Sequence, residues 1–225
     1  MAIDLSPTMR DYLVGIYRLS EHIDTDDAFV GTSSLADMLD VSPPAVNRMV
    51  IRLKDQGLLE HTPYQGIRLT VNGKCEALKQ LRNHRIAEAF LVNVMQFGWH
   101  EVHDEADRLC QGMTDTISAR MFEMAGHPAF CPHGEPIPTV EGVLSEPADI
   151  LLIDAQTETQ YEITRVRTRE SDRLEYLAAL GLVPSKRLSI IHQAPFNGPI
   201  QLKIGSEYRI IGHNLAELIK VLATA

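Results

Sequence analysis

The arrangement of helix starts and stops in the first third of the chain constrains the fold more than any other feature. Apolar residues recur there at helical spacing in three segments, and each segment ends at a polar residue or a glycine. Two short apolar runs around a Pro/Gly turn follow, which is the pattern of a β-hairpin. Three helices and a hairpin in this order predict a winged helix-turn-helix. The predicted helices are 8–21, 35–39 and 43–56, and the predicted strands are 58–62 and 67–70.

The second and third predicted helices follow residues that favour helix N-termini. The run from Thr32 to Ser34 offers N-caps for the second helix, and Asp40 ends it. Ser42 caps the third helix, and Pro43 occupies its first position, where a missing N–H removes no hydrogen bond. Gly57 ends this helix.

The third predicted helix is a candidate DNA-reading element. Residues 42–68 hold four basic and two acidic residues, a local charge of +2 in a chain of net charge −9. In a winged helix-turn-helix this helix lies in the major groove. Asn can pair with adenine, Ala or Pro can contact a thymine methyl group, and Arg can contact phosphates. An ordinary solvated surface is the alternative interpretation. The candidate DNA contacts are Thr32, Ser33, Ser42, Pro43, Pro44, Ala45, Asn47, Arg48, Arg52 and Arg68.

The remaining chain predicts a helical part and a β-rich part. Two long helices, from residue 70 or 72 to 97 and from 101 to 125, have more apolar surface than a small winged domain can cover. They predict a homodimer interface, with packing inside a bundle as the alternative. A proline-rich loop, 127–139, follows. Short β-like runs and one helix then predict a small β-barrel. These runs are 150–153, 161–166, 187–191, 200–204 and 208–211, with the helix at 171–180.

The long helices also carry candidate metal ligands at helical spacing. His84 and Glu88 are four residues apart and share one helix face. A second stripe lies on one face of the next predicted helix and consists of His103, Asp107, Cys110 and Gln111. Imidazole and carboxylate groups converging from two helices predict Mn²⁺, Fe²⁺ or Co²⁺ rather than structural zinc. Surface ion pairs and a buried structural cysteine are the alternatives. The tripeptide Cys131-Pro132-His133 lacks a second Cys/His pair at zinc spacing and is interpreted as loop structure.

Composition restricts the setting and the class of protein. Three widely spaced cysteines in 225 residues argue against a disulfide scaffold and for a reducing cytoplasm. No stretch approaches the roughly 20 apolar residues of a membrane span, and no signal peptide is visible. Residues 70–125 contain no Glu-x-x-His motif, which argues against a di-iron bundle enzyme. The sequence therefore predicts a regulator that is not an enzyme.

The order of these motifs resembles the diphtheria toxin repressor family of metal-dependent bacterial regulators. The matching segments are MRDYLVGIYRL (9–19), LADMLDVSPPAVNRMVIRLKDQGLL (35–59), LTVNGKCEAL (69–78), NHRIAEAFL (83–91), VHDEAD (102–107), HGEPIP (133–138) and, more loosely, LGLVPSKRLSI (180–190). The resemblance implies a homodimer in which metal favours the DNA-binding arrangement and represses uptake genes. It implies a mainly α fold with β: a winged helix-turn-helix (1–71), a helical metal-binding and dimerisation domain (72–139) and an SH3-like β-barrel (140–225).

The resemblance also implies two metal sites for Mn²⁺ or Fe²⁺. One would use His84, Glu88 and His103, and the other would use Asp11, Asp107, Cys110 and Gln111. The aspartate at position 11 resembles the manganese-type branch of the family. This chain departs from that branch at Val14, where the branch has a carboxylate. It also departs from the family at Cys110 and Gln111, where the family has a carboxylate followed by His. The third-domain ligands of the iron-type branch fall near Arg165 and Thr168, so Glu170 or Glu175 would have to reach in instead. A winged-helix regulator that senses an organic ligand or a partner is the alternative.

Overall fold

The computed structural model describes residues 5–21, 23 and 29–224, and these residues fold into two compact units. The first unit contains the described residues up to Asn83 together with Pro138–Leu144. The second contains His84–Ile137 and the described residues from Ser145 onward. The boundary falls within the long helix that begins at residue 71. The helical part from His84 onward belongs to one unit with the C-terminal sheet, and residues 71–83 belong to the other with the N-terminal helices and the hairpin.

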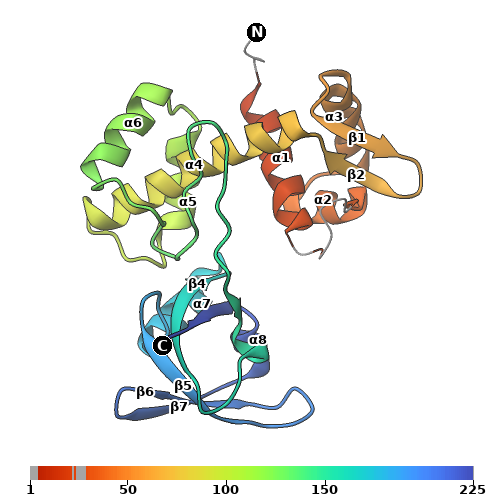
Figure 1. Cartoon of the computed structure of the whole chain (residues 1–225). Coiled ribbons are helices and arrows are strands. Elements are labelled where there is room, and N and C mark those ends of the chain that lie inside the picture. Colours follow the sequence, from red (N-terminus) through yellow and green to blue (C-terminus); the bar gives the residue numbers. More distant parts are fainter. Residues whose placement is uncertain (1–4, 22, 24–28, 225) are drawn as a thin grey trace. The chain divides into compact units, whose positions relative to one another are not determined.

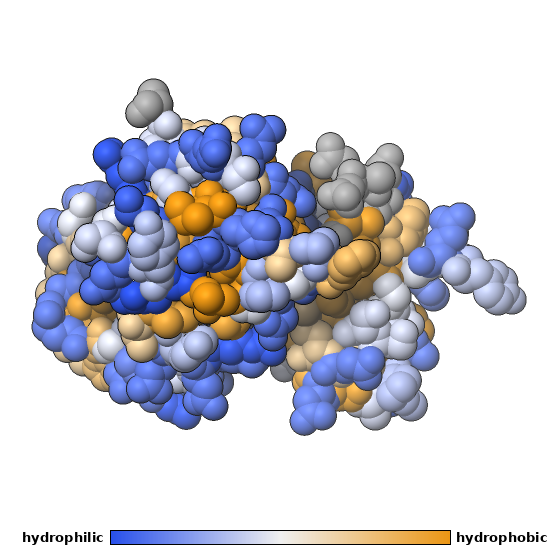
Figure 2. Space-filling view, turned by 90° about the horizontal axis from the view of Figure 1, so that it is seen from below, coloured by the Kyte–Doolittle hydropathy of each residue, from blue (hydrophilic) through white to orange (hydrophobic). Residues whose placement is uncertain are grey.

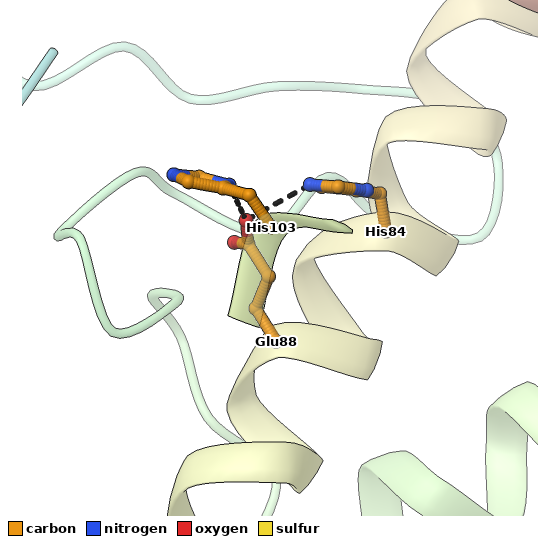
Figure 3. Close-up of side chains that lie close together, drawn as sticks. All are labelled: His84, Glu88 and His103. Carbon is orange, nitrogen blue, oxygen red and sulfur yellow. Dashed lines mark hydrogen bonds and ion pairs between the residues drawn. The ribbon is translucent and has the colours of Figure 1, made fainter. Parts of the chain in front are cut away.

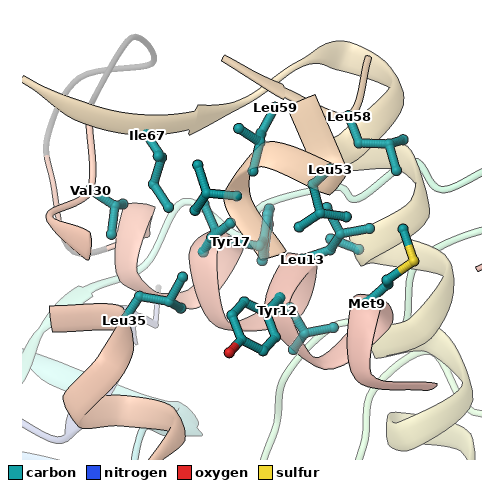
Figure 4. Close-up of a cluster of buried hydrophobic side chains, with 14 of the residues drawn as sticks. Met9, Tyr12, Leu13, Tyr17, Val30, Leu35, Leu53, Leu58, Leu59 and Ile67 are labelled. Atoms are coloured by element: carbon teal, nitrogen blue, oxygen red, sulfur yellow. The ribbon is translucent and has the colours of Figure 1, made fainter. Parts of the chain in front are cut away.

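The first unit has the winged helix-turn-helix fold that the sequence predicts. Its elements are α1 (Pro7–Ser20), α2 (Thr32–Leu39), α3 (Pro43–Asp55), β1 (Leu59–Thr62) and β2 (Gly66–Leu69), shown in Figure 1. The two strands are antiparallel, and Leu59 pairs with Leu69. Figure 4 shows the apolar side chains of all three helices meeting the hairpin. Met9, Leu35 and Leu53 are fully buried in this core, which fixes α3 against the other elements.

Two cap predictions in this unit need correction. Helix α2 already begins at Thr32, and its N-cap is Gly31, which has no side chain to bond. The run from Thr32 to Ser34 therefore forms the first helical turn instead of capping it. Ser42 is the N-cap residue of α3, as predicted, but its side chain accepts no capping hydrogen bond. Its hydroxyl group therefore makes no capping hydrogen bond to the helix, and the residue is exposed.

The helical part contains a break that the sequence analysis did not predict. Helix α4 (Val71–Asn93) ends four residues before the predicted end at residue 97. The predicted second helix is two helices, α5 (Val102–Cys110) and α6 (Asp115–Met124). The hydroxyl oxygen of Thr114 accepts a hydrogen bond from the backbone N–H of Ile117 and so begins α6. A cluster that includes Ile86, Val102 and Met121 packs the three helices together.

The C-terminal part is an antiparallel sheet with the strand order β3-β8-β4-β5-β6-β7. Its bounds are β3 (Ile150–Leu151), β4 (Gln160–Val166), β5 (Arg187–Gln193), β6 (Ile200–Ile204), β7 (Glu207–Ile211) and β8 (Ile219–Ala223). Three helical segments join them: the 3₁₀ turn η1 (Leu152–Asp154), α7 (Ser171–Ala179) and α8 (His213–Ala216). Bulges interrupt β4 and β5. In the described residues β3 and β7 remain sheet edges, so hydrogen bonds do not close the predicted barrel.

The face of the molecule seen in Figure 2 is mainly hydrophilic, with apolar side chains gathered in separate patches. On the helical part the large exposed apolar residues include Met95, Leu109, Ile117, Met124 and Phe130. No helix in the described part of the chain combines the length and hydropathy that crossing a bilayer requires.

Candidate metal centre

A buried carboxylate, that of Glu88, forms the middle of the site. Glu88 lies one helical turn after His84 on α4, and its Oε1 is 2.9 Å from Nε2 of His84. The spacing places both side chains on one face of the helix, as the sequence predicts. Both residues are buried, with exposed fractions of 2% for Glu88 and 6% for His84. A buried carboxylate is stable only with partners of opposite charge or with hydrogen-bond donors.

His103 reaches the same carboxylate from α5. Its Nδ1 lies 2.6 Å from Oε1 of Glu88, and Figure 3 shows the Glu88 carboxylate between the rings of His84 and His103. Neither buried ring nitrogen of His103 forms a hydrogen bond of good geometry. His103 therefore places an imidazole nitrogen directly beside a carboxylate, and imidazole and carboxylate are both groups that bind divalent transition metals.

The tripeptide at 131–133 lies in a loop, as interpreted from the sequence, but its Cys131 and His133 side chains also lie close to Glu88. Nδ1 of His133 lies 3.6 Å from Oε2 of Glu88, and Sγ of Cys131 lies 3.9 Å from the same nitrogen. The Nε2–H of His133 donates a hydrogen bond of 2.8 Å to the carbonyl of Trp99. This bond directs the other ring nitrogen toward Glu88 and Cys131. Glu88, Cys131 and His133 thus form a second possible ligand group that shares Glu88 with the first.

Several contacts hold this loop in place. The guanidinium of Arg85 donates to the carbonyl of Pro136 at 2.6 Å, and the backbone N–H of Val166 donates to the carbonyl of His133. Gly134 has φ 84°, and a side chain there would collide with the backbone of Thr164. Glycine is the residue that tolerates both conditions. The loop therefore packs against β4, and its conformation determines where Cys131 and His133 point.

Burial and charge act against each other in this centre. Burial lowers the pKa of His84, but Glu88 and hydrogen bonds to Asp107 and Cys110 raise it overall to about 10. Burial raises the pKa of Glu88, but the three surrounding histidines hold it well below its usual value. Without an ion, His84 is therefore an imidazolium whose two N–H groups donate to two carboxylates.

His103 and Cys131 stay uncharged without an ion. Burial lowers the pKa of His103 below its usual value, despite the nearby Glu88. Burial and the Glu88 charge raise the pKa of the Cys131 thiol well above its usual value. The rings of His103 and His133 stack at a centroid distance of 4.2 Å, an arrangement that disfavours charging both. The orphaned nitrogens of His103 and the mixed donor set therefore fit a divalent transition metal.

The residues predicted for the second site lie in both units. Asp107, Cys110 and Gln111 are on or directly after α5 in the second unit, whereas Asp11 is an exposed residue of α1 in the first unit. Oδ1 of Asp107 is 2.9 Å from Nδ1 of His84. Cys110 is buried in the helical core and contributes to the raised pKa of His84. Gln111 is exposed at the C-cap of α5.

Glu170 does not join the groups of candidate ligands that converge in the described residues. It is the N-cap residue of α7, and its Oε2 lies 2.8 Å from Nε of Arg173. The preceding residue, Arg169, instead contacts the helical part, with Nη2 2.6 Å from Oδ2 of Asp107.

The predicted DNA contacts occupy the exposed side of the first unit. Asn47, Arg48 and Arg52 are exposed on α3, and its buried side packs into the core through Val46, Val50 and Leu53. Ser33, Ser42, Pro43 and Pro44 are also exposed, whereas Thr32 and Ala45 are half-buried. Arg68 differs from the other arginines, since its guanidinium pairs with Glu60 at 2.8 Å and lies over the ring of Phe29.

Three family descriptions together match nearly the whole chain. Residues 4–67 match "Iron dependent repressor, N-terminal DNA binding domain", and residues 70–139 match "Iron dependent repressor, metal binding and dimerisation domain". Residues 150–223 match "FeoA domain".

Individual relatives align over similar lengths. The chain is 31% identical over 230 residues to the iron-dependent repressor IdeR of Mycobacterium tuberculosis, covering 97% of this chain and 98% of that protein. It is 29% identical over 177 residues, or 76% of each chain, to the diphtheria toxin repressor of Corynebacterium diphtheriae.

Solved structures of similar proteins have the same fold. A manganese-dependent transcriptional repressor in complex with manganese matches with a TM-score of 0.88 and 30% identity, over 96% of this chain and 100% of that one. ScaR with bound Zn²⁺ matches with a TM-score of 0.82 and 28% identity, over 97% and 100% of the two chains.

The fold, the centre and these likenesses define a metal-dependent DNA-binding transcriptional regulator. The chain belongs to the diphtheria toxin repressor family, whose members are transcriptional regulators and not enzymes. The resemblance, fold class and regulatory function predicted from the sequence are confirmed. The alternative, a regulator of this fold that senses an organic ligand, receives no support from the comparisons.

Proposed function

We propose that Mn²⁺ or Fe²⁺ binds at Glu88 and thereby favours the DNA-binding form of a homodimer that represses genes of metal homeostasis. The observation that carries this proposal is the buried Glu88 carboxylate, which faces His84, His103 and His133. The first site would use His84, Glu88 and His103 as ligands. Cys131 and His133 would extend it from the loop, because they share Glu88 with the first group.

The donor set supports manganese or iron over a structural zinc site. Carboxylate and imidazole ligands suit Mn²⁺ and Fe²⁺, whereas structural zinc sites are tetrahedral sets of Cys and His. The similar proteins support the same two metals. One is described as an iron-dependent repressor, and another as a manganese-dependent repressor in complex with manganese. A bound divalent ion would supply positive charge at Glu88. The proton on His84 would leave when its nitrogen becomes a ligand.

The second site would use Asp11 together with Asp107, Cys110 and Gln111. Asp11 is on α1, which packs in the core that also holds α3, and the other three residues lie on or directly after α5. An ion shared by these elements would stabilise one orientation of the DNA-binding unit. It can shift that equilibrium only by its different affinity for the two orientations. A coupling of about 1–3 kcal/mol changes DNA affinity by roughly 5–150-fold.

The DNA interface would be built on α3 and the hairpin. Asn47 and the residues before it would read base edges, while Ser42, Arg48 and Arg52 would contact phosphates. Arg68 would first have to exchange its contact with Glu60 for a phosphate. The exposed apolar residues of the helical part, such as Leu109 and Ile117, would be covered by the second subunit. We place this activity in the cytoplasm and assign it to the three segments 1–71, 72–139 and 140–225.

A DNA-binding titration against metals tests the proposal. Fluorescence anisotropy with a labelled promoter fragment should give strong binding with saturating Mn²⁺ or Fe²⁺ and weak binding with EDTA. Mg²⁺, which prefers oxygen ligands, is the control ion and should not replace them. Equal DNA affinity with EDTA and with Mn²⁺ would contradict the proposal and favour an organic effector.

A further inference from the structure

Asp107 connects two charged groups that belong to different parts of the second unit. Its Oδ1 lies 2.9 Å from Nδ1 of His84 on α4, and its Oδ2 lies 2.6 Å from Nη2 of Arg169. Arg169 precedes α7 in the C-terminal part. Both oxygens of this carboxylate therefore face N–H groups, and one of these groups carries the permanent positive charge of a guanidinium.

We propose that Arg169 is an internal cation that competes with a divalent ion for Asp107 and so raises the metal concentration at which the second site fills. This inference rests on the proposed function, in which Asp107 is a ligand of that site. Each carboxylate oxygen has a second lone pair, so an ion and Arg169 could both reach Asp107 in principle. The two positive charges would then lie within a few ångströms of each other, where their repulsion is appreciable.

The exposure of the pair makes such an exchange feasible. The side chains of Arg169 and Asp107 are 37% and 54% exposed. Water therefore screens their attraction and can solvate the guanidinium once it is displaced. A fully buried pair would instead resist separation, because an isolated charge would remain in the interior. Arg169 can therefore pair with the Asp107 carboxylate when no ion is bound, and a bound ion can displace the guanidinium from it.

The contact also gives the C-terminal part a role in metal response. Displacing Arg169 releases one bond between the segment before α7 and α5, so ion binding and this bond are thermodynamically linked. The effect must be reciprocal: a change that strengthens the Arg169–Asp107 contact weakens metal binding at the second site, and a change that removes it strengthens metal binding.

Three variants of the full chain test the inference. Arg169→Met keeps most of the side-chain length without the charge, and Arg169→Lys keeps the charge. Arg173→Met is the matched control, because Arg173 is similarly exposed at 42% but pairs with Glu170. Isothermal titration with Mn²⁺ alone gives the stoichiometry and the affinity of each site. DNA-binding titrations give the Mn²⁺ concentration at half-saturation.

We expect Arg169→Met to bind Mn²⁺ at the second site more tightly, by up to about fivefold, the most that an exposed charge pair supports. Arg169→Lys and Arg173→Met should behave like the parent chain. Adding Asp107→Asn to Arg169→Met should abolish the gain, since the gain acts through Asp107. Thermal melting in EDTA separates this role from a purely structural one, which would lower stability without improving Mn²⁺ affinity.

Two results would overturn the inference, and only one of them would also contradict the proposed function. If the parent chain binds Mn²⁺ and Arg169→Met binds it with equal or lower affinity, Arg169 is not a competitor, but the proposed function stands. If the parent chain binds neither Mn²⁺ nor Fe²⁺ at any site, both the inference and the proposed function fail.

Discussion

Oε2 of Glu88 lies 3.6 Å from Nδ1 of His133, so a helix residue and a loop residue far apart in the sequence face each other in a buried site. His84 and His103 approach the other oxygen of the same carboxylate. One acid thus gathers three imidazoles from α4, α5 and the loop after α6, and the metal response of the protein should depend on this arrangement.

Removing either first-site histidine should weaken metal binding. His84→Ala and His103→Ala each delete a ligand, and we expect a loss of at least about tenfold in Mn²⁺ affinity, the lower limit for residues that support metal sites. His192→Ala, an exposed histidine of β5, is the control. Isothermal titration checks the affinities, and circular dichroism checks the fold. Retained Mn²⁺ affinity in both folded variants would refute the site assignment.

The loop thiol should influence which metal binds. Cys131→Ser replaces a soft ligand by a hard one, so it should reduce Cd²⁺ affinity more than Mn²⁺ affinity. Cys75→Ser is the matched control, since Cys75 lies in the other unit. Competition titrations with Cd²⁺ and Mn²⁺ measure the ratio of affinities. An unchanged ratio in Cys131→Ser would show that the thiol does not bind the ion.

The stability of the ion-free protein should have a defined pH optimum. Burial lowers the pKa of His84, but Glu88, Asp107 and Cys110 together raise it from 6.5 to about 10. The charged His84 therefore stabilises the fold fully below pH 6.5 and progressively less as the pH rises through 10. The lowered pKa of Glu88 stabilises the fold above pH 4.5, and this contribution is lost as the pH falls below it. Urea unfolding in EDTA should therefore show a maximum near pH 4.5–6.5 that His84→Ala flattens. A His84→Ala profile with the same shape as the parent would contradict this explanation.

Metal binding should respond to pH in the opposite direction. An ion takes a nitrogen lone pair of His84 and displaces about one proton, so affinity should rise roughly tenfold per pH unit between pH 7 and 9. Titrations in buffers of different ionisation enthalpy count the released protons. Zero protons released would mean that His84 is already neutral without the ion, or that it is not a ligand.

The DNA interface separates into positioning and reading residues. Arg52→Ala should weaken binding to all sequences and lower the salt-dependence slope by about one, as loss of a phosphate contact does. Asn47→Ala should lose about 1–3 kcal/mol at one base position and little elsewhere. Arg187→Ala, an exposed arginine of β5, is the control. A loss in Arg52→Ala that is confined to one base position would assign Arg52 to base reading.

The buried Arg165 should hold the loop behind the centre. Its guanidinium bonds to Asp149 at 2.9 Å and also reaches Glu135 at 3.2 Å, and the Asp149 side chain is fully buried. Arg165→Met would leave that carboxylate with weaker partners, which costs about 3–5 kcal/mol of unfolding free energy. Chemical denaturation measures this value, with Arg187→Met as control. A loss below 1 kcal/mol would show that the network is dispensable.

Local sequence signals predicted most of the fold. Helices α1 and α3 were placed within a residue or so because periodic apolar residues and Gly or Pro signals agree there. The helix predicted from 101 to 125 was wrong, because apolar periodicity continues through the break, whereas Thr114 begins a new helix. Strand β8 was not predicted, because no turn signal separates it from the short helix α8.

The candidate site likewise has ligands that could be predicted from the sequence and ligands that could not. The His84–Glu88 pair could be predicted because both residues lie on one helix, where the spacing alone determines the shared face. Cys131 and His133 could not, because their partner Glu88 comes from another element, and spacing rules consider only ligands close in sequence. Gly134, which directly follows His133 and comes three residues after Cys131, was the available signal of a tightly packed loop.

Anomalous X-ray scattering from crystals grown with Mn²⁺ tests the central claim most directly, because it locates the ion independently of any activity. We expect a manganese peak within bonding distance of Glu88, His84 and His103. A fully folded protein that binds Mn²⁺ elsewhere, with no peak beside Glu88, would contradict the account.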